Sequence, residues 1–201
     1  VLLPEFPKGV TFEIPGNFKY DNIAWTRIFK SMLESITMSF WGTLIGLLLS
    51  LPLSFLASPL IVPSYISYPT RFVVTFFRTV PALIWAFLFV SFLGLGPWPG
   101  IAALSIYSIG YLSKLIYEGI ENNSKSSYKA LRSLNASSYQ ILLRAVWPAN
   151  KKVIISSFLY IFEYNIRSSA ILGFVGAGGI GQDIVYAMEW RDFGFVVTSI
   201  C

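Results

Sequence analysis

Residues 36–57, ITMSFWGTLIGLLLSLPLSFLA, contain no charged side chain, and this stretch decides the class of fold. A helix needs about 20 mostly apolar residues to cross the hydrocarbon core of a bilayer, so this stretch is long enough to cross it once. Gly42, Gly46 and Pro52 lie within it. In a membrane bundle, small residues allow close helix contact and neighbouring helices satisfy the carbonyl that a proline frees. We therefore predict a membrane-spanning helix here.

The composition of the whole chain also indicates a membrane protein. Of its 201 residues, 55% are apolar and 12% are charged, whereas soluble domains have about 45–50% and about 25%. The chain has no His and one cysteine, Cys201, which excludes histidine catalysis, most zinc sites and an intramolecular disulfide. The net charge of +5 is attributed to membrane topology, because no basic stripe with interleaved aromatic residues suggests a nucleic-acid partner. We expect no catalytic residues, no metal site and no cofactor bound by this chain.

Further apolar stretches predict an all-α membrane protein with four complete spans and a truncated fifth. Residues 1–35 are expected to form an extracytoplasmic lead-in and residues 36–201 the transmembrane domain. The spans are expected at about residues 36–57, 72–93, 101–117, 153–172 and 193–201. Because the chain starts without Met and stops as the last span begins, we interpret it as a fragment. The sequence GLGPWPG at residues 94–100 predicts a tight turn after the second span.

Lysine and arginine residues gather in the loop of residues 118–152, between the third and fourth spans. Cytoplasmic loops are enriched in these residues, so we place this loop in the cytoplasm. Within it, residues 125–148, here called the elbow, fit two short amphipathic helices with a break at Asn135. Ser137 and Gln140 have the spacing of a capping box that starts the second helix. A capped elbow is more than a plain linker needs, so we expect a docking element.

The elbow sequence KALRSLNASSYQILLRAVWP resembles the cytoplasmic EAA loop of binding-protein-dependent ABC importer permeases. That family has Glu-Ala-Ala, three residues, Gly, nine residues, Ile, one residue and Leu-Pro. Counting back from Pro148, Lys129 stands where the family has Glu and Asn135 where it has Gly. The other correspondences are Ala130 and Leu131 for the two alanines, Ala145 for Ile and Trp147 for Leu. The stretches FFRTVPALIWAFLFVSFLGLGPWPGIAALSIYSIGYLSKLIYEGIEN and FEYNIRSSAILGFVGAGGIGQD resemble the phosphonate-type permeases in particular.

The resemblance implies a multi-span helical bundle of the type I ABC importer permease kind in the cell (inner) membrane. It implies a homodimer in the lipid bilayer, a cytoplasmic ATP-binding subunit that receives the elbow, and an extracytoplasmic substrate-binding protein. The chain has no GxxxxGK[ST] sequence, so ATP is expected to be used by the partner subunit. The implied contacts with that subunit are Lys129, Ala130, Leu131, Arg132, Leu134, Asn135, Ala136, Ser137, Gln140 and Pro148.

The implied solute is a phosphonate or a related phosphorus oxyanion. An ABC permease for another small solute, such as an amino acid, is an alternative. A secondary transporter is a further alternative, but it predicts inverted repeats that the sequence does not show.

Three ionisable residues inside the predicted spans, Arg78, Glu163 and Arg167, are candidates for the translocation path. A charge at the bilayer centre costs at least about 2.5–3.5 kcal/mol unless it is paired or hydrated. Glu163 and Arg167 have the spacing and order of a favourable ion pair on one helix face. This pair either pins helices together or supplies Arg167 to an anionic substrate. Arg78 either reaches the cytoplasmic interface or offsets the charge of that substrate.

The glycines of VGAGGIG, at residues 175–181, form a candidate outer gate: Gly176, Gly178, Gly179 and Gly181. Three of them match GxGxxG, but they follow a membrane span rather than a strand, which argues against a dinucleotide site. Glycine allows positive φ and close approach of other groups. The segment is therefore either a flexible gate or docking loop, or a plain turn that re-enters the bundle.

Overall fold

The computed structural model describes residues 22–123, 125–134 and 136–189 of the chain. Within these residues every regular element is helical, which confirms the predicted all-α fold. The elements are α1 (Asn22–Ala57), α2 (Ser64–Thr79), α3 (Ala82–Leu93), α4 (Pro97–Asn123), α5 (Lys125–Ser133), α6 (Ser138–Ile141), the π-helical turn η1 (Leu142–Val146), α7 (Trp147–Leu172), the 3-10 turn η2 (Gly173–Val175) and α8 (Gly179–Glu189).

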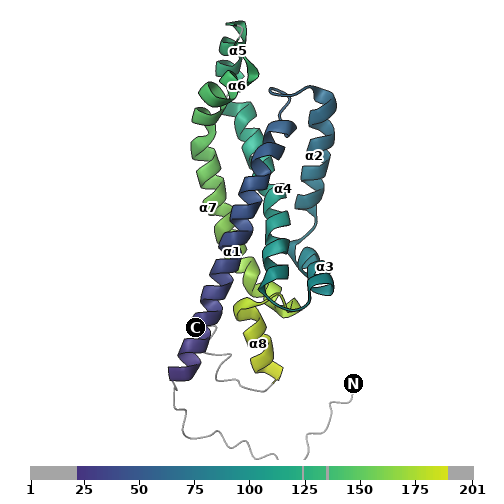
Figure 1. Ribbon diagram of the computed structural model, residues 1–201, viewed down its shortest axis with the longest axis vertical. Helices are drawn as coiled ribbons and strands as arrows, with labels where there is room; N and C mark the ends of the chain where they lie inside the picture. The colour runs from purple at the N-terminus through teal and green to yellow at the C-terminus, as the bar shows by residue number, and fades with distance from the viewer. Residues whose placement is uncertain (1–21, 124, 135, 190–201) are drawn as a thin grey trace, which may run out of the picture.

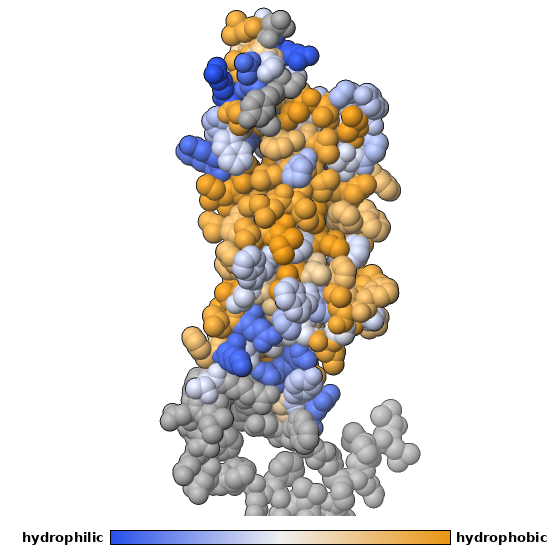
Figure 2. Space-filling view, viewed as in Figure 1, coloured by the Kyte–Doolittle hydropathy of each residue, from blue (hydrophilic) through white to orange (hydrophobic). Residues whose placement is uncertain are grey.

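The described helices form an elongated bundle in which α1, α4 and α7 run along the long axis (Figure 1). The elbow helices α5 and α6 project at the upper end, and α8 lies at the lower end (Figure 1). Apolar side chains cover the middle of the visible face, and hydrophilic ones gather towards its two ends (Figure 2). Within the described residues, three helical stretches are long and apolar enough to cross a membrane: Ile28–Ala57, Pro97–Asn123 and Leu143–Glu189. The chain is thus a multi-pass membrane protein.

Prolines mark where several of the helices begin. Pro63 and Pro81 immediately precede α2 and α3, Pro97 is the first residue of α4, and Pro148 lies in the first turn of α7. The fixed φ of proline suits the start of a helix, where its missing N–H has no intrahelical partner to lose. After α3, Gly94 and Gly96 adopt positive φ of 82° and 138°, which confirms the predicted turn.

The second predicted span, residues 72–93, is not one continuous helix. Helix α2 ends at Thr79, α3 begins at Ala82, and the two helices are bent by 84° at this break. Val80 between them has the extended ψ of 120°. The residue before a proline avoids the helical region because of a clash with the proline ring, so Pro81 explains the break. The described residues hold up to four spans if this bent pair counts as one.

The ends of the predicted segments also shift. Helix α1 begins at Asn22, so residues 22–35, which we expected in the lead-in, are helical and continuous with the first span. Residues 179–189, expected in a loop, form α8. The predicted fifth span at residues 193–201 and the first 21 residues lie outside the described part of the chain.

Helices α1 and α4 meet at the two glycines that the sequence singled out. A Cβ atom at Gly42 would lie 2.7 Å from the Cβ of Leu104, and one at Gly46 would lie 2.4 Å from the Cβ of Ser108. These separations are too short for real carbon atoms, so only glycine permits the observed approach. The predicted role of both glycines in close helix contact is confirmed.

A buried hydrogen-bond network joins the same two helices to α7. The side-chain amide of Asn165 on α7 donates to the hydroxyl oxygens of Thr43 on α1 and Ser108 on α4, both at 2.8 Å. All three residues are fully buried. Because lipid gives no hydrophobic drive for helices to associate, polar bonds of this kind hold membrane helices together.

We predict that Gly46→Val destabilises the purified protein by about 1–3 kcal/mol, because an over-packed contact forces the two backbones apart. Reversible unfolding in mixed detergent micelles would measure the change. Leu48→Val, on the exposed side of the same helix, is the matched control and should have little effect. Equal stability of the two variants would contradict the role assigned to Gly46.

Candidate functional site

Arg78 lies in the last turn of α2, where that helix rests on the middle of α4. A Cβ atom at Gly110 of α4 would lie 2.6 Å from the backbone nitrogen of Arg78, so the two backbones touch at this point. The guanidinium carbon lies 4.8 Å from the centre of the Tyr111 ring, which is a cation–π contact. Arg78 therefore contacts the centre of the bundle rather than reaching towards an end of it.

Arg78 differs from the other arginine of α2, Arg71. Arg71 also lies over a tyrosine ring, 4.7 Å from the centre of Tyr117, but it forms an ion pair with Glu121. Its Nε additionally donates to the backbone oxygen of Ala57 at 2.8 Å. Among the described residues no carboxylate is ion-paired with Arg78. The positive charge of Arg78 is thus left to act on whatever enters the space beside it.

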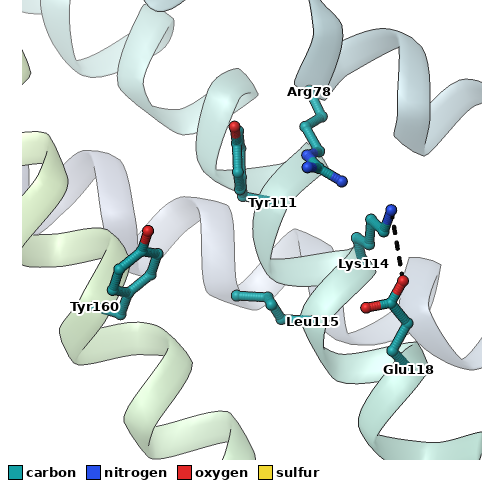
Figure 3. Close-up of a pocket in the computed structure, with 6 residues that line it drawn as sticks. All are labelled: Arg78, Tyr111, Lys114, Leu115, Glu118 and Tyr160. Carbon is teal, nitrogen blue, oxygen red and sulfur yellow. Dashed lines mark ion pairs between the residues drawn. The ribbon is translucent and has the colours of Figure 1, made fainter.

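That space is a cavity of about 280 Å³, lined by Arg78, Tyr111, Lys114, Leu115, Glu118 and Tyr160. Four of these residues come from one side of α4, Arg78 comes from α2, and Tyr160 stands across from them on α7 (Figure 3). Lys114 Nζ lies 3.5 Å from Glu118 Oε1. The lining therefore carries two cations and one carboxylate, with tyrosine hydroxyl groups as hydrogen-bond donors.

A stack of tyrosine rings links this cavity to α7. The rings of Tyr111 and Tyr107 are 4.7 Å apart, and the ring of Tyr107 stacks on that of Tyr164 at 5.1 Å with 15° between the planes. The sequence analysis missed these tyrosines. Their spacing in the sequence could have identified them. Residues four apart lie on one face of a helix, which places Tyr107 with Tyr111 on α4 and Tyr160 with Tyr164 on α7.

The structure confirms the ion pair between Glu163 and Arg167 but does not bring it into the cavity. The two side chains are 66% and 76% exposed, so the pair lies on the surface of this chain. Both residues belong to α7, and the pair does not pin α7 to another helix in the described part of the chain. Their spacing from Tyr160 and Tyr164 places them on the same face of α7 as the cavity.

The glycine segment is a tightly packed turn. Gly176, Gly178 and Gly179 have positive φ of 81°, 84° and 72°, a conformation that favours glycine. A Cβ atom at Gly181 would lie 1.9 Å from the backbone oxygen of Ala170, so the start of α8 is pressed against the end of α7. The segment therefore forms a tightly packed turn that re-enters the bundle, and its role as an outer gate or docking loop stays a prediction.

Helix α1 holds the start of α8. The backbone N–H of Ile180 donates to the hydroxyl of Ser35 at 2.9 Å, and that of Gly179 donates to Glu34 Oε1 at 3.4 Å. One turn earlier on α1, Ser31 donates to the carboxylate of Asp183. Any role of the glycine segment as an outer gate requires these contacts to open.

At the other end of the bundle, the structure confirms the predicted capping box. The backbone N–H of Gln140 donates to the hydroxyl of Ser137 at 3.3 Å, and the backbone N–H of Ser137 donates to Gln140 Oε1 at 3.0 Å. This reciprocal pair starts α6, as the sequence spacing predicted. Asn135, the predicted break between the helices, lies outside the described residues.

Of the two leucines that were expected to contact a partner, the elbow exposes Leu134 and turns Leu131 towards the chain's own core. Leu131 is half-buried and packs against the chain's own core, which includes Ile141 and Val146, so it does not form an outward docking face. Ala136 packs against the same core. Leu134 is 77% exposed, and Leu143 and Trp147 are also exposed, at 48% and 46%, so these apolar side chains of the elbow are available to a partner. The exposed residues among the remaining candidates are Lys129, Ala130, Arg132, Ser137, Gln140 and Pro148.

We predict that the face of α7 with the ion pair meets water. In a background without other cysteines, Arg167→Cys should react rapidly with a charged, water-soluble thiol reagent in membrane vesicles. Leu48→Cys, exposed on α1 within the uncharged residues 36–57, is the control and should react at least about tenfold more slowly, because apolar surroundings disfavour the reactive thiolate. Equal rates would show that this face meets lipid.

Residues 42–201 match the family described as binding-protein-dependent transport system inner membrane component. Over 181 residues the chain is 37% identical to the phosphate-import permease protein PhnE of Mycolicibacterium smegmatis. This alignment covers 90% of this chain and 34% of that protein. Over 172 residues the chain is 34% identical to the phosphite transport system permease protein PtxC of Stutzerimonas stutzeri. This alignment covers 85% of this chain and 62% of that protein. The chain thus spans between about a third and three fifths of the length of these relatives.

Solved structures of ABC importers share the fold. An inward-facing structure of the methionine ABC transporter MetNI aligns with a TM-score of 0.74 at 19% identity, covering 90% of this chain and 88% of that chain. An amino acid ABC transporter aligns with a TM-score of 0.70 at 22% identity, and the alignment covers 89% of this chain and 86% of that chain. These likenesses confirm the helical bundle of the type I ABC importer permease kind. The family match, which extends over most of the chain, shows that the protein belongs to the binding-protein-dependent transport system inner membrane components.

Proposed function

We propose that this chain forms the translocation path for a phosphonate or a related phosphorus oxyanion in an ATP-driven importer. The observation that carries the proposal is the cavity beside Arg78, in which a cation without a carboxylate partner among the described residues faces an open space. A charge at the centre of a bilayer costs at least about 2.5–3.5 kcal/mol unless it is paired or hydrated. An anion that passes through the cavity would use that charge.

The chemistry of the cavity suits an oxyanion. Guanidinium groups bind phosphorus oxyanions through paired N–H donors, and the Arg78 guanidinium lies at the cavity, 4.8 Å from the centre of the Tyr111 ring. Tyrosine hydroxyl groups and Lys114 add further donors. The names of the relatives PhnE and PtxC, which mention phosphate and phosphite, support the same class of solute.

We further propose that ATP is used by a separate cytoplasmic subunit that binds the elbow, and that no cofactor is bound by this chain. The exposed, basic and capped elbow at one end of the bundle supports this arrangement (Figure 1). An extracytoplasmic binding protein would deliver the solute at the opposite end. A second copy of the permease would lie across a water-filled path from the face of α7 that carries the exposed Glu163–Arg167 pair. Neighbouring genes for an ATPase and a binding protein would support this assembly.

Replacement of Arg78 tests the solute path. In proteoliposomes that contain the complete transporter, we expect Arg78→Gln to reduce ATP-dependent phosphate, phosphite or phosphonate uptake at least about tenfold, equivalent to about 1.4 kcal/mol. Arg78→Lys, which keeps the charge, should retain more of the uptake. Size-exclusion chromatography would check assembly. Uptake at the wild-type rate by an assembled Arg78→Gln variant would refute the path.

Replacement of Leu134 tests the elbow. Leu134→Asp should prevent co-purification of the ATP-binding subunit while the permease stays folded, because it puts a charge on an exposed apolar contact. Leu134→Met is the matched control and should co-purify normally. Leu131→Asp should instead lower the stability of the permease itself, since Leu131 packs against its own core. Normal recovery of the subunit with Leu134→Asp would exclude Leu134 from the docking surface.

A further inference from the structure

The carboxylate in the cavity, Glu118, has no role in the function proposed so far. It lies on α4 one turn after Lys114, with its Oε1 3.5 Å from Lys114 Nζ (Figure 3). A carboxylate lining the path of an anion should repel it, unless the carboxylate has a specific use there. The geometry of this ion pair indicates what that use is.

The Lys114–Glu118 pair is weak. Its separation of 3.5 Å exceeds the usual length of about 2.7–2.9 Å for a charge-assisted hydrogen bond. Lysine precedes glutamate in the chain, which is the less favourable order for a pair one helical turn apart. The two side chains are 34% and 46% exposed, so water competes for both of them. Little free energy is lost when another anion takes the place of Glu118 beside Lys114.

The cavity has space for such an anion next to both cations. Its volume of about 280 Å³ is several times the roughly 30 Å³ that one water molecule occupies in the liquid, so a hydrated tetrahedral oxyanion fits. Both cations line the cavity: Arg78 comes from α2 and Lys114 from α4 (Figure 3). Tyr160 on α7 adds a hydroxyl donor from the opposite side.

We propose that Glu118 is an internal substitute for the substrate: it neutralises Lys114 while the cavity is empty and is displaced when a phosphorus oxyanion enters. With Glu118 in place, the lining has one unneutralised cation, Arg78. With Glu118 displaced, Arg78 and Lys114 together match a doubly charged oxyanion. When the oxyanion leaves, Glu118 returns to Lys114, which favours release. This inference rests on the proposed function and assigns a doubly charged phosphorus oxyanion to the cavity.

The decisive measurement is equilibrium binding of radiolabelled inorganic phosphate, at a pH where the dianion predominates. The protein is the detergent-purified permease with its ATP-binding subunit and without the binding protein, so that only the membrane site is measured. Removing the competitor with Glu118→Gln should tighten phosphate binding about fivefold or more. It should also slow ATP-dependent uptake by the complete transporter, because release is no longer assisted. Lys114→Gln should weaken phosphate binding by a similar factor.

Glu118→Asp separates displacement from a general effect of charge. The shorter side chain keeps the negative charge but holds it farther from Lys114 and weakens the pair, so displacement predicts that phosphate binds more tightly than to the wild type. A general electrostatic effect predicts no change for Glu118→Asp and tighter binding only for Glu118→Gln, and this result would overturn the inference.

Absence of phosphate binding in the wild type and in every variant would also overturn the inference. If uptake of a phosphorus oxyanion by the complete transporter then remained normal, the proposed function would stand without this site. If the complete transporter took up no phosphorus oxyanion, the proposed function itself would fail.

Discussion

The close contact between α1 and α4 at Gly42 and Gly46 determines how the other described helices are placed. With no side chains between them, the two backbones approach closely enough for Thr43 and Ser108 to share one hydrogen-bond donor. That donor is the side-chain amide of Asn165 on α7, so its two hydrogen bonds attach α7 to both α1 and α4. Van der Waals contact and buried polar bonds thus supply the specificity that hydrophobic burial cannot supply in lipid.

Helix α4 is the element from which the candidate site is built. One side of it contacts α1, and the turn around Gly110 receives the end of α2 and so positions Arg78. The cavity residues Tyr111, Lys114, Leu115 and Glu118 follow immediately. Because α4 is held by α1, α2 and α7 at once, the cavity wall is supported by the best-connected helix of the described chain.

The sequence predicted those features that depend on composition or on local chemistry. Uncharged length predicted the spans, the Ser137–Gln140 spacing predicted the capping box, and the order of Glu163 and Arg167 predicted their ion pair. Features that depend on which helix faces which were not predicted. Leu131 looks like part of an outward face until the chain folds back on it, and Asn165 is indistinguishable in sequence from a solvated amide. The break before Pro81 could have been predicted, because the residue before a proline avoids the helical conformation. The spans were predicted from hydropathy alone, which does not take this preference into account.

The π-helical turn η1, within the elbow, joins α6 to α7 and changes the angular relation between these two helices. In η1 both Ala145 and Val146 are buried, four and five positions after the buried Ile141, whereas the buried Asn150 and Ile154 of α7 follow Val146 at intervals of four. One extra residue in a helical turn rotates everything before it by about 100° relative to everything after it. A helical wheel drawn through α6 and α7 as one regular helix would therefore assign the elbow the wrong outward face. The outward surface of α6 is offset by roughly a quarter turn from the surface that the periodicity of α7 implies.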